Sequence, residues 1–146
     1  MQVLLDEGVP APLAIVLRLL EPEHSFAHVN DLGWNGTTDP VLFQRAAASH
    51  YEVIVALDRN QLTNADEWRA LKKSRLHHVS VKQNKSTQGA RGAIRILASL
   101  AAAMPRVLDD LVVAAGGQVV EVAVIRDRAR HATWSYKDHE RVTRAL

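Results

Sequence analysis

Acidic residues that directly follow predicted β-strands are the feature of this sequence that could do chemistry. The apolar run at residues 3–5 continues into Asp6, and the apolar run at residues 53–57 continues into Asp58. Ligands of open parallel sheets bind at the carboxyl ends of the strands, so neighbouring strands would bring these two carboxylates into one crevice. A hard divalent cation such as Mg²⁺ or Mn²⁺ would relieve their mutual repulsion. The alternative is that each charge marks where a buried strand returns to water.

A third carboxylate, Asp39, precedes Pro40 at the predicted start of a helix. This helix would follow the second strand, so Asp39 would lie on the same edge of the sheet as Asp6 and Asp58. Helix capping also explains the residue, with Asp39 at the N-cap and proline at the first helical position. The sequence leaves both roles open.

The elements that must position these residues are predicted by the alternation of apolar and amphipathic segments, which is typical of an α/β domain with a largely parallel sheet. We expect strands at residues 2–5, 25–29, 53–57, 77–81 and 119–125. Helices are expected from Pro12, Pro40, Asn64 and Gly89. The helix at 12–20 is apolar nearly all round and should be mostly buried, and Pro105 should kink or divide the last helix. The 146 residues fit one domain, 1–146.

Composition narrows the class of protein. The chain has no cysteine, which excludes disulfides and thiolate zinc sites. The apolar start meets Asp6 and Glu7 at once, unlike a signal peptide, and no segment has the length of a membrane span. These features favour a cytoplasmic protein with no membrane partner.

Charge is distributed unevenly along the chain. Residues 1–70 contain four Lys/Arg and ten Asp/Glu, whereas residues 71–146 contain fourteen and six, giving net charges of −6 and +8. An acidic cation site beside a basic surface for a polyanion would have this distribution, although ordinary solvated helix faces would too. The candidate phosphate contacts are Lys82, Lys85 and Arg91 after the fourth strand, and Arg126, Arg128 and Arg130 on one face of a continued fifth strand. The three arginines could instead protect an edge strand or face a homodimer partner.

Three stretches resemble a known family. LLDEGVP at 4–10, HVNDLGWNGTTDPVL at 28–42 and VIVALDRN at 53–60 are similar to PIN-like domains related to the VapC-type toxin ribonucleases of toxin–antitoxin systems. The resemblance implies a three-layer PIN-like fold with a mostly parallel sheet of about five strands flanked by helices. It also implies Mg²⁺- or Mn²⁺-dependent endoribonuclease activity, an RNA substrate bound by the basic residues, and a cognate antitoxin as partner.

Carried over by position, the family's metal-binding aspartates correspond to Asp6, Asp39 and Asp58, with Glu7 adjacent. The family's second aspartate in its D-x-D pair corresponds to Asn60, which keeps an oxygen ligand but loses a negative charge. Three interpretations follow. The site could hold one metal, it could use Glu7 as a replacement ligand, or the chain could keep the fold as a binding module without activity.

Two other interpretations use parts of the same segments. A signalling receiver domain would also have an acidic pair after its first strand and a phosphorylated aspartate, here Asp58, after its third. A receiver also needs a small hydroxyl residue at the end of its fourth strand and a lysine-proline pair after its fifth. This chain instead has Val79-Ser80-Val81-Lys82-Gln83 and Ile125-Arg126 at these places. A zinc site built from the histidine pairs at 24 and 28 or 77 and 78 lacks a third ligand at a suitable spacing.

Overall fold

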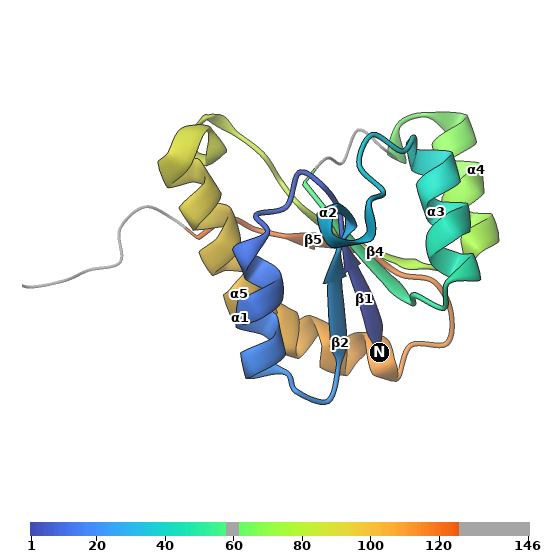
Figure 1. Cartoon of the computed structure of the whole chain (residues 1–146), viewed down its shortest axis with the longest axis horizontal. Helices are drawn as coiled ribbons and strands as arrows, with labels where there is room; N and C mark the ends of the chain where they lie inside the picture. The colour runs from blue at the N-terminus through green and yellow to red at the C-terminus, as the bar shows by residue number, and fades with distance from the viewer. Residues whose placement is uncertain (58–61, 126–146) are drawn as a thin grey trace, which may run out of the picture.

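The computed structural model describes residues 1–57 and 62–125, in which strands and helices alternate along the chain (Figure 1). In order, the elements are β1 (Gln2–Leu5), α1 (Pro12–Leu20), β2 (Ser25–His28), α2 (Val29–Leu32), α3 (Asp39–Ala48), β3 (Val53–Ala56), α4 (Ala65–Ser74), β4 (His77–Val81), the 3₁₀ turn η2 (Lys85–Thr87), α5 (Gly89–Val112) and β5 (Val119–Val122).

The strands form one five-stranded sheet in the order β2-β1-β3-β4-β5. Every pairing is parallel, with Leu5 opposite His28 in β2 and opposite Val55 in β3. The expected parallel sheet of about five strands flanked by helices is therefore confirmed. Because β1 lies between β2 and β3, the strand order reverses direction beside β1, and in open α/β sheets ligands bind at such a reversal.

Helices cover both faces of the sheet, which makes three layers (Figure 1). Helices α1 and α5 lie on one face, and α3 and α4 lie on the other. Successive side chains of β1 point to opposite faces, so Val3 and Leu5 pack with the α1 and α5 core and Leu4 packs with the α3 and α4 core. All four residues of β3 are buried, as its continuous apolarity predicts.

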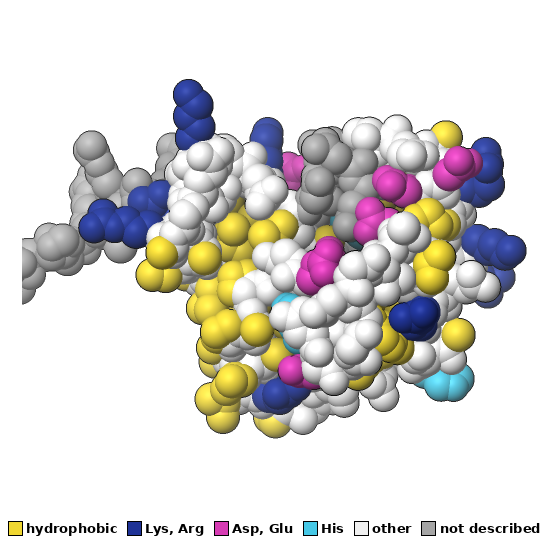
Figure 2. All heavy atoms as spheres, turned by 45° about the horizontal axis from the view of Figure 1, so that its top comes forward, with side chains coloured by type: hydrophobic (Ala, Val, Ile, Leu, Met, Phe, Trp, Pro, Cys, Tyr) yellow, Lys and Arg dark blue, Asp and Glu magenta, His cyan; other side chains and the backbone are white. Residues whose placement is uncertain are grey.

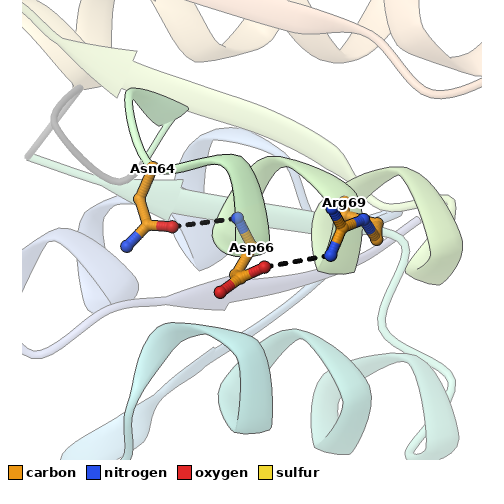
Figure 3. Close-up of polar contacts among 3 residues, drawn as sticks. All are labelled: Asn64, Asp66 and Arg69. Carbon is orange, nitrogen blue, oxygen red and sulfur yellow. Dashed lines mark hydrogen bonds and ion pairs between the residues drawn. The ribbon is translucent and has the colours of Figure 1, made fainter.

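The two helices on the second face begin differently, since a side chain caps α4 but no side-chain cap is present at α3. Figure 3 shows the Asn64 side chain accepting a hydrogen bond from the Asp66 amide at 2.9 Å, which confirms the predicted N-cap of α4. The ion pair between Asp66 and Arg69 in the same view is exposed and contributes little. At α3 the prediction was wrong by one residue, because Thr38 is the N-cap and Asp39 is the first helical residue.

Pro105 does not divide the last helix, since α5 runs unbroken through it. The proline removes one backbone hydrogen bond, but buried residues on both sides of it, Met104 and Leu108, pack into the same core cluster. The helix begins at Gly89, as expected, and ends at Val112. Residue 29 belongs to α2, a helix that the sequence did not predict, and β5 ends at Val122.

The expectation that α1 is mostly buried was wrong. Leu13, Ala14 and Leu17 are buried, but Ile15, Leu19 and Leu20 are 60%, 79% and 51% exposed. A helix in an outer layer presents only one stripe to the sheet, and no described element covers the other side of α1. Within the described residues, no helix has both the length and the apolarity to cross a membrane.

Candidate active site

Asp6 lies where β1 and β3 end side by side. Its amide donates to the Val55 carbonyl at 2.9 Å, so the pairing of the two strands continues one residue beyond β1. Because Leu5 pairs with Val55, this contact puts Asp6 level with Ala56, the last residue of β3. Its side chain is partly buried. Asp58 follows Ala56 by two positions in the sequence, but Asp58 and Asn60 lie outside the described residues.

Glu7 connects the loop after β1 to the loop before α3. Its Oε2 accepts a hydrogen bond from the Gly36 amide at 3.1 Å. Gly36 has a φ of 70°, a conformation that glycine adopts without strain. Asp39 begins α3 three residues later and is partly buried. The structure thus brings Asp6, Glu7 and Asp39 to the same edge of the sheet. In the sequence, Asn35 and Gly36 indicate a turn but not its contact with Glu7.

Acidic side chains gather on this face of the molecule. In Figure 2, which brings forward the edge where the strands end, Asp and Glu side chains run across the centre of the face, while Lys and Arg side chains lie mostly toward its margins. Hard oxygen donors of this type suit Mg²⁺ or Mn²⁺ better than softer metals. The oxygen donors therefore suit the kind of ion that the sequence predicts. Asp6, Glu7 and Asp39 share the edge, but among the described residues their ligand atoms do not form a group of three within 4.8 Å of one another.

His28 is a supporting residue whose role the sequence did not reveal. It ends β2 and is almost fully buried, beside Leu5. Its Nδ1 accepts from the Asn30 amide at 3.1 Å, so its Nε2 carries the proton and donates to the Val9 carbonyl at 2.8 Å. With both ring nitrogens engaged, His28 fixes the loop after Asp6 instead of binding a metal.

The predicted basic residues lie at the same edge, beyond β4. Lys82 follows β4, Lys85 is in η2, and Arg91 is in the first turn of α5; all three are exposed. The Asn84 side chain accepts from the Ser86 amide at 2.8 Å, which stabilises the turn that carries Lys85. Arg126, Arg128 and Arg130 lie outside the described residues.

A different acidic group lies at the opposite edge of the sheet. Glu21, Glu23 and His24, between α1 and β2, have ligand atoms within 4.8 Å of one another, and in the described part of the chain they form the one such group of three. The His24 Nδ1 is already bonded to the N-terminal ammonium at 2.7 Å. Partial burial and the neighbouring Glu23 carboxylate raise the pKa of Glu21. The sequence did not predict this group, in which Glu23 is exposed and Glu21 and His24 are partly buried.

The strand order by itself does not separate a nuclease from a receiver domain, since receivers also have the order 2-1-3-4-5. The end of β4 does separate them. Ser80 is buried inside the strand opposite Ala56, and the strand then continues into Val81 and exposed Lys82. No small hydroxyl residue therefore ends β4, as the sequence indicated.

Comparison with protein families gives one result. A family model described as a PIN like domain matches residues 1–83, more than half of the 146 residues, and the match includes Asp6, Asp39 and β4. No match was found among curated proteins or among solved structures.

Proposed function

The chain belongs to the PIN-like domain family, and from this premise we propose that it is a Mg²⁺- or Mn²⁺-dependent endoribonuclease. PIN-like domains are typically nucleases that use a divalent metal ion. The observation that carries the proposal is the position of Asp6, at the reversal of strand order and level with the end of β3. Glu7 and Asp39 lie on the same edge, so their carboxylates add to the negative potential there.

Each residue has a role in this proposal. Asp6 and Asp58 hold the ion, and Asp39 either holds it too or orients the attacking water. When bound, the ion supplies a water of lowered pKa and neutralises charge on the phosphate. Either the amide oxygen of Asn60 or the carboxylate of Glu7 is the further ligand of the ion. The basic residues beyond β4, Lys82, Lys85 and Arg91, bind the RNA backbone.

The resemblance of residues 4–10, 28–42 and 53–60 to VapC-type proteins supports a narrower proposal, in which the chain is the toxin of a toxin–antitoxin pair. Its antitoxin would cover the acidic edge or the basic residues beside it. Expression without the antitoxin should then slow growth, and Asp58→Ala should relieve the effect. Equal growth inhibition by both proteins would contradict the toxin proposal.

The metal site is tested by thermal unfolding of the purified chain in Mn²⁺. An ion that binds only the folded state at 100 times its Kd stabilises that state by about 2.7 kcal/mol. We expect Mn²⁺ to raise the melting temperature, and Asp6→Asn to abolish the increase and RNA cleavage together. The matched control is Glu21→Gln with Glu23→Gln, which removes two carboxylates from the opposite edge. The proposed site would be contradicted if Mn²⁺ no longer raised the melting temperature of this control but still raised that of Asp6→Asn.

Asn60→Asp tests whether the site is active as it stands. A carboxylate binds Mn²⁺ more strongly than an amide oxygen does, so we expect tighter Mn²⁺ binding and faster RNA cleavage. Both should be measured on the same preparations of the original and substituted chains. Tighter binding without cleavage by either protein would indicate a binding module that has lost the enzymatic activity.

A further inference from the structure

The 3₁₀ turn η2, between β4 and α5, is held by hydrogen bonds at both of its ends. The Asn84 side chain accepts from the Ser86 amide at 2.8 Å, and the Asn84 amide donates to the Thr87 hydroxyl at 3.0 Å. The same hydroxyl donates to the Asn84 carbonyl at 2.7 Å. From α5, the Arg95 guanidinium donates to the Ser86 carbonyl at 2.6 Å. The backbone of η2 is therefore fixed both by its own side chains and by the helix that follows it.

Gly92 lets this turn lie directly against the start of α5. It is a buried residue of the helix. A β-carbon at this position would overlap the carbonyl carbon and the carbonyl oxygen of Thr87. Both are backbone atoms, which cannot rotate away as the end of a flexible side chain could. Glycine weakens a helix relative to alanine, but here only glycine permits the close approach of α5 and η2.

Lys85 is the residue that this packing presents to solvent. Within η2, Thr87 is 7% exposed and Ser86 is partly buried, whereas Lys85 is exposed. A cation on a backbone that is already fixed loses less conformational entropy on binding than a cation on a loose loop does. The packing of η2 on α5 should therefore raise the affinity of Lys85 for a polyanion without adding any contact.

We propose that Gly92 and Thr87 are positioning residues that hold Lys85 where it binds the RNA backbone. This inference rests on the proposed ribonuclease function. Neither positioning residue touches RNA, because they fix the backbone of η2 and Lys85 makes the contact. Neither carries a charge, so replacing one of them removes no cation from the chain. A change in the salt dependence of RNA binding would then come from a cation that they position.

A double-mutant cycle on the full chain tests this dependence, with a fluorescent single-stranded RNA titrated over a range of salt concentrations. We expect Gly92→Ala to weaken binding and to reduce the slope of log K against log salt by about 0.7, the value for one lost phosphate contact. Lys85→Gln should reduce the slope equally. In the Lys85→Gln chain, Gly92→Ala should have no further effect.

Thr87→Val provides a second variant if Gly92→Ala does not fold. Valine has nearly the shape of threonine but cannot form the two hydrogen bonds with Asn84, so it loosens η2 without an overlap. Thr87→Val should behave like Gly92→Ala, whereas Thr87→Ser keeps the hydroxyl and should bind RNA as the original chain does. In Mn²⁺-dependent cleavage, Thr87→Val should raise KM and leave kcat unchanged, because the lost contact holds substrate and transition state equally.

Gly116→Ala is the matched control. Gly116 precedes β5 at the opposite edge of the sheet, and a β-carbon there would meet no atom beyond its chain neighbours within 4 Å. We expect no change in RNA binding or in its salt slope. The inference would be overturned if Gly92→Ala weakened binding in the Lys85→Gln chain as much as in the original one, and the ribonuclease proposal would stand. Failure of the original chain to bind any RNA would overturn both.

Discussion

Two adjacent histidines of β4, His77 and His78, lie in different environments. Successive side chains of β4 point to opposite faces of the sheet, which removes the apparent histidine pair. His77 accepts a hydrogen bond from the Gln118 amide at 3.1 Å. His78 is fully buried on the other face, where its ring packs edge-on against Phe43 with the centroids 6.3 Å apart.

Burial lowers the pKa of His78 from 6.5 to about 4, which predicts a loss of stability in acid. Between pH 6.5 and about 4, His78 is protonated in the unfolded chain but stays neutral in the folded chain. The free energy of unfolding therefore falls as the pH decreases through this range. At pH 5 this single group should cost roughly 2 kcal/mol. Urea unfolding at pH 7 and pH 5 should show that His78→Leu removes this part of the pH dependence.

His50→Asn is the control for the histidine experiment. His50 is exposed and has a φ of 66°, a conformation that asparagine tolerates. This variant should keep the pH dependence of the original chain. If His78→Leu also keeps it, His78 does not contribute to acid sensitivity.

At the scale of elements, α1 combines a buried and an exposed apolar side. Leu13→Ala should lower the free energy of unfolding by about 2–5 kcal/mol because Leu13 is fully buried against the sheet. Leu19→Ala, on the same helix, should change it by less than about 0.5 kcal/mol because Leu19 is largely exposed. Urea unfolding compares the two variants directly. A large decrease in Leu19→Ala would mean that another surface covers this side of α1 in solution.

At the scale of the whole molecule, acidic and basic residues occupy different parts of one edge of the sheet. The acidic residues after β1 and at the start of α3 share one edge of the sheet with the basic residues after β4. We therefore expect RNA that binds the basic residues to lie beside the carboxylates. Replacing Lys82, Lys85 and Arg91 with Gln should weaken RNA binding. The slope of log K against log salt should fall by about 2 if all three bind phosphates, at about 0.7 for each phosphate.

Lys72, Lys73 and Arg106 provide a control with the same change in net charge. They lie in the last turn of α4 and in the second half of α5, away from the edge that carries Asp6. Replacing them with Gln should leave the salt slope nearly unchanged. Equal slopes for the two triple variants would show that RNA responds only to net charge.

The sequence by itself determined much of this protein. Apolar runs and capping residues predict the strands and most helices because both signals are local, as at β3 and Asn64. Aspartates after two such strands also predict a shared site, because parallel strands end at one edge. Residues 58–61 and 126–146 lie outside the described residues, so Asp58, Asn60 and the three arginines remain predictions from sequence.

Only the tertiary structure decided contacts that join distant segments. The Glu7 contact with Gly36 and the Ser99 contact with Ile125 depend on strand order and on how α5 packs, which no local pattern encodes. The exposed side of α1 has the same origin. Its residues are apolar nearly all round, so only the position of the sheet decides which of them are buried. Local chemistry thus determines which elements form, and packing determines which side chains meet.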